Sequence, residues 1–491
     1  MGIGQTIHQT ARRFPEKPAL IYEGEVLTYK QFYETVCKLR TYLKKLAPNE
    51  KPTIAILIGN EPAFLELFFA VITIGGMAAP FDPTWSKQEA ETMLRKIQPD
   101  VVIASKQFLA TASYSIPATD IDELKQLPAP PDETAWNTFQ DEPFYLGFTS
   151  GTTGMPKGYI RSHRSWLESF RAAEKVFHLT EDATILAPGP LCHSLSLCSA
   201  VHALHLGATF YLTSFAQVRN MLHKMDNMFL FAVPSMLYVL ADERKPIDQK
   251  ITFVSAGDKL DHGLVTRLRQ AYPNSRLFEY YGASELSYVS YTKHHDAAAP
   301  HAGKPFPGVD ITIRTEDGSI ARPGEIGQIY IHSPFLFTGY VTHPKETKNV
   351  LTPYGATVGD IGFINKNGAL SIIGRKKNMI ITGGLNVYPE EVEKVIKEVP
   401  AVKEAVVIGK ADPLRGQKII ALIQWNTDPD ILTVQAHCKR NLATYKIPKK
   451  FLSVSDFPRT SSGKIDRQKL QKKGIHHENT CHYSSQTNSH R

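Results

Sequence analysis

The sequence has little cysteine for a chain of 491 residues. Its five cysteines are too scattered for a disulfide framework, and no two have the spacing of a metal-binding pair; they are Cys37, Cys192, Cys198, Cys438 and Cys481. This argues against a disulfide-stabilised secreted domain. We therefore expect a reducing compartment and predict a cytoplasmic protein.

Long uninterrupted apolar runs are also missing. The most apolar stretch, residues 62–81, contains Glu66 and the pair Gly75-Gly76. This pattern predicts a buried helix that leads into a strand, and it argues against a membrane span. The first 17 residues lack the apolar core of a signal peptide, so neither a signal peptide nor a transmembrane segment is expected.

What is present is an ordinary globular composition. Hydrophobic residues make up 42% and charged residues 21%, with 32 Gly and 32 Pro spread along the chain, which excludes a collagenous or wholly disordered protein. At about 100 to 200 residues per domain, the length allows two to four packed units.

The net charge of +8 is unevenly distributed. From Arg375 onward there are 21 of the 56 basic residues (Lys and Arg) and 11 of the 48 acidic residues (Asp and Glu). The part before Arg375 therefore holds 35 basic and 37 acidic residues. The chain is thus a near-neutral body with a basic C-terminal quarter. An evenly spread excess would suggest nucleic acid, but this distribution does not, and we expect no nucleic-acid partner.

The first 270 residues alternate between strand and helix patterns. A hairpin is predicted at residues 19–22 and 26–28, and Thr28 with Gln31 forms a capping box that starts a helix. Short apolar runs predict strands at 54–58, 101–104, 229–233 and 251–254, with helices at 63–74, 235–241 and 260–271. This alternation indicates an α/β fold with mainly parallel, helix-covered sheets.

The pattern changes after about residue 300. Alternating strands at 310–314, 328–332, 361–364 and 369–373 predict a small antiparallel section, and the polar residues 374–377 predict a linker. A helix from Pro389, strands at 404–408 and 419–425, and a helix near 433–442 then predict a compact α+β domain. We predict domains at 1–374 and 375–470 and a disordered tail at 471–491. Disorder is favoured there over a metal site of His476, His477, Cys481 and His482.

The most specific stretch is residues 148–158, Phe-Thr-Ser-Gly-Thr-Thr-Gly-Met-Pro-Lys-Gly. It combines hydroxyls, glycines and a lysine, the groups that close around a phosphate chain. A Walker loop is not the explanation, because Pro156 and Gly158 stand where that motif has Gly and Ser or Thr. The predicted phosphate ligands are Thr149, Ser150, Gly151, Thr152, Thr153, Gly154 and Lys157.

This loop resembles the phosphate loop of the acyl-adenylate-forming superfamily, which includes acyl-CoA synthetases, nonribosomal-peptide adenylation domains and beetle luciferase. Further motifs of the superfamily follow in order, and the matches span residues ~20 to 467. They are Tyr281-Gly-Ala-Ser-Glu285, Gly324-Glu-Ile-Gly327, Gly359-Asp360, Gly374-Arg375, the run 383–391 and the run 458–464. The resemblance implies a large N-terminal AMP-binding domain and a small, mobile C-terminal lid.

The resemblance also implies roles for single residues. Tyr281, beside Gly282, would stack on adenine, and Ser284 would bind the α-phosphate of ATP. Glu285 would hold Mg²⁺, which prefers carboxylate and phosphate oxygens. Asp360 and Arg375 would hold the ribose hydroxyls, since a carboxylate can accept hydrogen bonds from two adjacent hydroxyls.

The C-terminal motif supplies the predicted catalytic lysine. Lys464 follows a glycine turn, and its ammonium would offset the negative charge that gathers between the attacking carboxylate and the α-phosphate. By resemblance, the lid would turn about Lys377, and Gly383-Gly384 would line a tunnel for the thiol of coenzyme A. Lys464 would then leave the site for the second half-reaction.

The predicted substrate is a fatty or other apolar carboxylic acid. The segment Pro190-Leu-Cys-His193 has no acidic residue where α-amino-acid-activating relatives carry an aspartate, and a buried unpaired ammonium is costly. His193 would gate the acyl pocket, although an ordinary partly buried histidine is the alternative. The apolar residues nearby suit an acyl pocket or core packing equally; they are Leu195, Leu197, Val201, Leu204, Ala232 and Val233.

The sequence departs from the family at Val358, where a threonine is common. Val358 points only to a protein that binds nucleotide without catalysis. Three functions stay open at this point. The leading prediction is an acyl-CoA ligase that uses ATP, Mg²⁺ and coenzyme A. The second enzyme would load a separate acyl carrier protein, and the third protein would bind nucleotide without catalysis. The basic C-terminal quarter would attract either coenzyme A or an acidic carrier protein.

Overall fold

The computed structural model describes residues 2–109, 116–126, 128, 140–149, 156–243, 245–295, 299–341, 343–413, 415–459 and 465–472. The chain divides into two compact units. Unit 1 comprises Met1–Val358 and Phe363–Ile372, and unit 2 comprises Gly359–Gly362 and Ile373–Arg491. The domain boundary predicted between residues 374 and 375 lies close to this division in the chain.

The first sheet of unit 1 has a parallel centre and antiparallel edges. Among the described residues its strand order is β15-β14-β13-β12-β11-β9-β10-β1-β2. Neighbours from β13 to β1 are parallel, whereas β2, β14 and β15 join antiparallel. The strands are β1 (Pro18–Tyr22), β2 (Glu25–Thr28), β9 (Thr184–Leu186), β10 (Thr209–Leu212), β11 (Met228–Ala232), β12 (Ile251–Ala256), β13 (Arg276–Ala283), β14 (Ser287–His294) and β15 (Lys304–Pro305).

The second sheet has the order β18-β8-β7-β4-β3-β5-β6 in the described part of the chain. Strands β7, β4, β3, β5 and β6 are parallel, and β8 and β18 add an antiparallel edge. Its strands are β3 (Thr53–Leu57), β4 (Met77–Pro80), β5 (Val101–Ala104), β6 (Ala118–Asp120), β7 (Pro143–Thr149), β8 (Lys157–Ser162) and β18 (Gly339–Tyr340).

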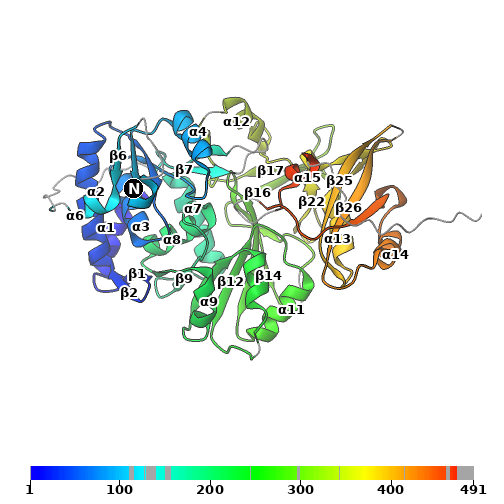
Figure 1. The fold of residues 1–491 in the computed structure, drawn as a ribbon, viewed down its shortest axis with the longest axis horizontal. Coiled ribbons are helices and arrows are strands. Elements are labelled where there is room, and N and C mark those ends of the chain that lie inside the picture. Colours follow the sequence, from blue (N-terminus) through cyan, green and yellow to red (C-terminus); the bar gives the residue numbers. More distant parts are fainter. Residues whose placement is uncertain are drawn as a thin grey trace, which may run out of the picture. The chain divides into compact units, whose positions relative to one another are not determined.

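Helices α3 (Pro62–Thr73), α7 (His163–Phe177) and α8 (Ser194–Leu206) lie between these two sheets (Figure 1). Every residue of α3 after Pro62 is buried, because the helix is predominantly apolar and its one carboxylate, Glu66, is paired with Lys125 at 2.8 Å. The largest hydrophobic core includes residues of α3, α7, α8 and both sheets. Helices α1 (Ile3–Arg13) and α2 (Tyr29–Leu46) pack on α3, and α2 begins at the predicted capping box of Thr28 and Gln31.

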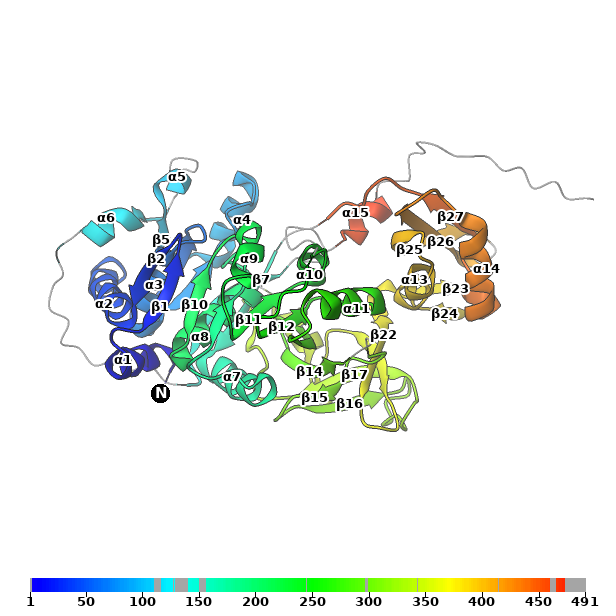
Figure 2. The same ribbon diagram turned by 90° about the horizontal axis from the view of Figure 1, so that it is seen from below.

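A second core lies on the other face of the first sheet. Helices α9 (Phe215–Leu222), α10 (Pro234–Leu240) and α11 (His262–Ala271) bury apolar residues there against β11 and β12, and α10 and α11 are seen beside these strands in Figure 2. The second sheet has its own outer core with α4 (Lys87–Ile97). The shorter helices are α5 (Lys106–Leu109), α6 (Ile121–Gln126) and α12 (Pro344–Val350).

The third sheet has the order β19-β20-β17-β21-β22, with β16 paired to β17. Pairs β16–β17, β17–β20 and β19–β20 are antiparallel, which confirms the predicted antiparallel section. The strands are β16 (Asp310–Arg314), β17 (Gly327–His332), β19 (Leu351–Thr352), β20 (Gly355–Ala356), β21 (Asp360–Ile364) and β22 (Leu370–Arg375).

Unit 2 is the predicted α+β domain. Its sheet has the order β24-β23-β26-β25, with β27 paired to β26, and its core includes residues of α13 and α14. The elements are β23 (Ile380–Thr382), β24 (Leu385–Val387), α13 (Pro389–Lys397), β25 (Val402–Asp412), β26 (Gly416–Trp425), α14 (Ile431–Asn441), β27 (Lys450–Ser453) and α15 (Arg467–Lys472).

The predicted α/β class and element order are confirmed, with one local difference. The segment 374–377, predicted as a polar linker, is the end of β22 followed by the 3₁₀ turn Lys376–Asn378. Its backbone is ordered because Lys376 N–H donates to Gly359 O at 2.8 Å. No helix within the described ranges is long and apolar enough to cross a membrane.

Candidate active site

The predicted phosphate loop connects β7 to β8, the antiparallel strands at the edge of the second sheet. Thr149 ends β7 and pairs directly with Lys157 at the start of β8. The other loop residues lie outside the described residues; they are Ser150, Gly151, Thr152, Thr153 and Gly154. The hairpin therefore brings the two ends of the motif together at one edge of unit 1.

The Lys157 ammonium lies beside a carboxylate and an aromatic ring. It forms an ion pair with Glu346 of α12, and it lies 5.9 Å from the centre of the Tyr340 ring. The Lys157 side chain is 13% exposed and the Glu346 side chain 39% exposed. An anionic ligand at this hairpin would therefore compete with Glu346 for the lysine.

The Tyr281–Glu285 motif forms the turn between β13 and β14. The register shifts between Tyr281 and Gly282, and Leu286 N–H closes the turn on Ala283 O at 3.0 Å. Only glycine fits at position 282, because a Cβ there would lie 2.1 Å from Ser287 O. The turn consequently presents Ser284 and Glu285 as half-buried residues at the end of the hairpin.

Glu285 is held on both its backbone and its side chain by the segment before α12. Phe337 N–H donates to Glu285 O at 2.9 Å, and Tyr340 Oη donates to Glu285 Oε1 at 2.6 Å. Burial raises the pKa of the Tyr340 phenol, and the Glu285 carboxylate adds to this shift. Tyr340 therefore remains a hydrogen-bond donor to Glu285 near neutral pH.

Arg161 of β8 is buried and connects three parts of the site. Its guanidinium donates to Ser284 O at 3.1 Å, to Phe335 O at 2.6 Å and to Ser165 Oγ at 3.0 Å. Burial lowers the pKa of Arg161, but a guanidinium stays charged at neutral pH. Arg161 therefore fixes the Ser284 backbone relative to the strand that starts at Lys157.

Tyr159, on the same strand as Arg161, is buried, and its hydroxyl lies 3.3 Å from that of Tyr145. Burial raises the pKa of Tyr159, and the neighbouring Tyr145, Arg161, Ser284 and Ser194 act in the opposite direction. His193, the N-cap of α8, directly precedes Ser194.

His193 also has an acidic neighbour that the sequence did not reveal. Its Nε2 lies 3.7 Å from Oδ2 of Asp82, a buried residue in the loop after β4. Burial lowers the pKa of His193, and the Asp82 carboxylate partly offsets this shift. The histidine side chain is 28% exposed, so a ligand of the site can reach it.

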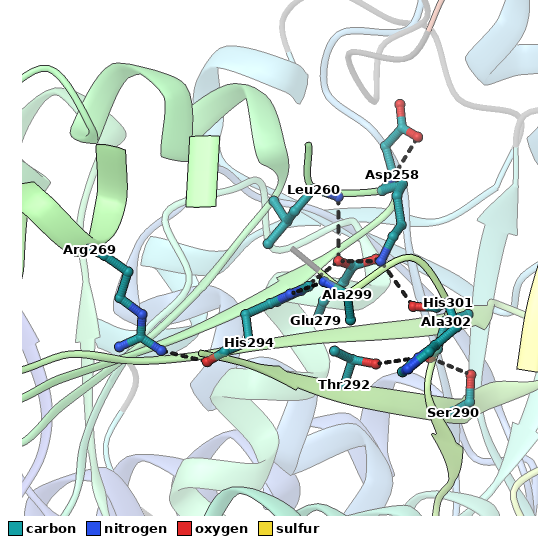
Figure 3. A network of polar contacts seen from close by, with 11 residues as sticks. Asp258, Leu260, Arg269, Glu279, Ser290, Thr292, His294, Ala299, His301 and Ala302 are labelled. Carbon is teal, nitrogen blue, oxygen red and sulfur yellow. Dashed lines mark hydrogen bonds and ion pairs between the residues drawn. The ribbon is translucent and has the colours of Figure 1, made fainter. Parts of the chain in front are cut away.

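A buried network fixes the loop after β12, next to the Tyr281 strand (Figure 3). Ala299 N–H donates to His294 Nδ1 at 3.1 Å, which leaves Nε2–H to donate to Glu279 Oε2 at 2.8 Å. Lys259 Nζ lies 3.0 Å from the other carboxylate oxygen of Glu279 and donates to His301 O at 3.0 Å.

This network positions a loop that the parallel topology places beside the adenine motif. Ala256, the last residue of β12, is paired with Tyr280 of β13. Glu279 and His294 are both buried, and Leu260 N–H also donates to Glu279 at 3.4 Å. Ligands of parallel sheets bind at the carboxyl ends of the strands, which is where this loop and Tyr281 lie.

The remaining predicted residues belong to unit 2 or adjoin it in sequence. Arg375 Nε forms a 2.9 Å ion pair with the buried carboxylate of Asp360, so this predicted pair is in contact. Val358 packs against the core of unit 1. The hydroxyl of the neighbouring Thr357 accepts a hydrogen bond from Gln328 Nε2 at 3.1 Å.

The predicted hinge and tunnel residues lie at exposed turns. Lys377 is part of the 3₁₀ turn after β22 and is exposed. Gly383 and Gly384 connect β23 to β24 with φ values of +59° and +76°, and added Cβ atoms would meet nothing within 4 Å. Lys464, the predicted catalytic lysine, lies outside the described residues.

The comparisons with known proteins match both units. The family model "AMP-binding enzyme" matches residues 7–341, and "AMP-binding enzyme C-terminal domain" matches residues 391–464. The chain is 37% identical to the uncharacterized acyl–CoA ligase YhfT of Bacillus subtilis, over 96% of this chain and 98% of the relative. It is 29% identical to VraA of Staphylococcus haemolyticus, whose name proposes a long chain fatty acid–CoA ligase, over 93% of this chain and 95% of the relative.

The similarity extends to solved structures. The O-succinylbenzoate coenzyme A synthetase MenE of Bacillus subtilis, in complex with ATP and magnesium, is 26% identical and superimposes with a TM-score of 0.88, over 95% of this chain and 99% of that protein. The chain therefore belongs to the AMP-binding enzymes. Within that family it belongs to the acyl-CoA synthetase branch of the acyl-adenylate-forming superfamily, the AMP-forming acid–thiol ligases.

Proposed function

We propose that this chain activates an apolar carboxylic acid with ATP and then transfers the acyl group to coenzyme A. The observation that carries the proposal is the junction of three motifs in unit 1. Arg161 joins the Lys157 strand to the Ser284–Glu285 turn, and Tyr159 on the same strand has Ser284 and Ser194, the residue after His193, among its electrostatic neighbours. The acyl–CoA ligase names of its relatives support the same reaction.

The groups at this junction suit a nucleoside triphosphate. Lys157 and the hydroxyls of the 149–154 loop would bind its phosphates, and Ser284 would bind the α-phosphate. The half-buried Glu285 carboxylate is a hard oxygen ligand suited to Mg²⁺, as is expected from the MenE complex with ATP and magnesium. The bound ion would neutralise phosphate charge during the reaction.

The reaction would proceed in two chemical steps. A carboxylate oxygen bonds to the α-phosphorus of ATP while the bond from that phosphorus to pyrophosphate breaks, giving acyl-AMP and pyrophosphate. The sulfur of coenzyme A then bonds to the acyl carbon, AMP leaves, and the thiol proton passes to solvent. Lys464 would stabilise charge only in the first step, and Asp360 with Arg375 would hold the ribose.

The acyl site would lie beside His193. Leu197, Val201 and Leu204 are fully buried in the core, whereas Leu195 and Val233 are half-buried and are the better candidates for acyl contacts. Asp82 also lies beside the histidine, but its Oδ1 accepts two bonds from Thr84 and its Oδ2 faces His193 Nε2 at 3.7 Å. We therefore propose that the substrate is an apolar carboxylic acid. Amino acids are the contrasting substrates in the screen described next.

A screen of carboxylic acids with ATP, Mg²⁺ and coenzyme A tests this function. It should include fatty acids of several chain lengths, aryl acids and α-amino acids, with acyl thioester and AMP measured together. Thioester formed from apolar acids supports the proposal. AMP formation that needs a purified acyl carrier protein instead of coenzyme A would identify the other acceptor.

Replacement of the proposed catalytic lysine provides a mutational test with an internal control. Lys464→Ala should abolish acyl-AMP formation while thioester formation from supplied acyl-AMP survives. Lys469→Ala is the matched control, because Lys469 is 62% exposed and lies 3.5 Å from Asp466. Equal loss of both half-reactions in Lys464→Ala would contradict the assigned role.

A further inference from the structure

We propose that Asp82, Cys192 and His193 form a binding site for Zn²⁺ at the entrance to the acyl site. One ligand atom of each residue lies within 4.8 Å of the others. The residues come from two segments more than 100 positions apart, so their sequence spacing gave no sign of the site. Carboxylate, thiolate and imidazole are the three ligand types that zinc sites use.

The spacing suits a shared ion better than a hydrogen bond. Tetrahedral zinc with bonds of about 2.0–2.3 Å places its ligand atoms roughly 3.3–3.8 Å apart. His193 Nε2 and Asp82 Oδ2 are 3.7 Å apart, which lies in that range and is too long for a hydrogen bond. The three ligand atoms lie within 4.8 Å of one another, so small side-chain adjustments would bring them around one ion.

Both ligand segments are already held by neighbouring groups. Asp82 Oδ1 accepts from the backbone N–H of Thr84 at 2.9 Å and from its hydroxyl at 2.7 Å, which turns Oδ2 toward His193. Asn60 donates to Gly189 O at 3.0 Å and accepts from Leu191 N–H at 2.8 Å, which fixes the loop before Cys192. Such outer contacts orient metal ligands and increase affinity.

The ligand set also selects the ion. A thiolate and an imidazole favour Zn²⁺ and disfavour Mg²⁺, which prefers oxygen ligands. Three protein ligands leave one position for water or another small ligand, and the His193 side chain is 28% exposed, which gives an ion access. Cys192 and Asp82 are buried, so they are shielded from competing solvent on their other sides.

Occupancy of this site would regulate the ligase. This part rests on the proposed function, in which the acyl site lies beside His193. A bound ion would hold the imidazole at Asp82 and Cys192, so Zn²⁺ would inhibit activation of the acid. The binding measurement does not depend on turnover, so failure of the proposed function and failure of the metal site are distinguishable.

The binding experiment uses the full chain after removal of metal with a chelator. Zn²⁺ is titrated in competition with a chromophoric chelator, and Co²⁺ is used in parallel because its visible spectrum reports coordination number and thiolate ligation. We expect one tight site per chain with a four-coordinate cobalt spectrum. Cys192→Ser and Asp82→Asn should each weaken binding by about 100-fold or more, beyond the ~10–100-fold typical of an outer contact.

Two other cysteines serve as controls. Cys198→Ser alters a thiol on α8 six residues away, and Cys481→Ser alters the His- and Cys-containing C-terminal stretch, which lies outside the described residues. Both controls should retain full binding. Unchanged affinity in Cys192→Ser and Asp82→Asn, or loss of the site in Cys481→Ser, would overturn the proposal.

The inhibition experiment follows acid-dependent AMP formation at increasing free Zn²⁺ with Mg²⁺ held constant. We expect inhibition in the unmodified chain at the concentration that fills the site, and at least about tenfold less sensitivity in Cys192→Ser. Circular dichroism of Cys192→Ser verifies folding, and Asp82→Asn replaces it if it does not fold. Equal inhibition of the unmodified chain and a folded variant would refute the regulatory role.

Discussion

Arg161→Met would remove the guanidinium that joins the Lys157 strand to the Ser284 turn. Two carbonyls, the half-buried one of Ser284 and the buried one of Phe335, would lose donors now at 3.1 and 2.6 Å. Each bond to a charged group contributes about 1.5–3 kcal/mol, and release from the cost of burying the charge offsets part of this. We expect a net loss of about 2–4 kcal/mol in the local stability of the site.

Hydrogen exchange measured by mass spectrometry reports this loss directly. The relevant amide is Phe337 N–H, which donates to Glu285 O at 2.9 Å. At 1.4 kcal/mol per factor of ten, its exchange should accelerate by about 30- to 1,000-fold. Acid-dependent AMP formation should fall by about 100-fold, because small displacements of positioning groups have effects of that size.

Arg164→Met is the matched control. Arg164 lies three residues away, is 50% exposed, and forms its ion pair with the exposed Asp141. Exposed ion pairs contribute about 0.2–1 kcal/mol, so this variant should keep the exchange rate of Phe337 within about fivefold. If Arg161→Met also leaves that rate and the activity unchanged, the reasoning about Arg161 is wrong.

Three further changes have defined outcomes. Gly282→Ala places a Cβ 2.1 Å from Ser287 O and should lower AMP formation by about tenfold or more, whereas Gly59→Ala meets nothing within 4 Å and should retain activity. Burial lowers the pKa of His163 from 6.5 to about 3, so the unfolded chain gains a proton that the folded chain cannot take. Stability should fall by about 1.4 kcal/mol per pH unit below pH ~6.5, and urea midpoints at pH 7 and 5 should differ less in His163→Gln. Glu279→Gln removes the carboxylate charge at the centre of the network in Figure 3. It should raise the KM for ATP about three- to tenfold and leave the KM for the acid unchanged. An unchanged KM for ATP would contradict the positioning role of Glu279.

The fold was largely predictable because its signals are local. The capping box at Thr28, the short apolar strands and the apolar helix before Gly75-Gly76 depend on neighbours within a few residues, and the structure has them at the expected places. The predicted linker at 374–377 was wrong in detail. The strand predicted at 369–373 continues through Gly374 and Arg375, and the backbone bond from Lys376 to Gly359 depends on a residue distant in sequence.

The site residues that could be predicted from the sequence are those that lie within recognisable motifs. Arg161, Tyr340 and Asp82 were not identified, because each acts through a contact more than 50 residues away in the chain. One signal was available for Arg161. The two-residue period of β8 places it on the same buried face as Tyr159, and a buried charge requires partners.

Acid-dependent exchange of labelled pyrophosphate into ATP tests the central claim most directly, because it requires formation of acyl-AMP and nothing after it. The full chain with ATP and Mg²⁺ should show exchange with at least one apolar carboxylic acid and without coenzyme A. Lys464→Ala should lose that exchange, and Lys469→Ala should keep it. Absence of exchange across the whole acid panel, in a chain that still binds ATP, would contradict the account.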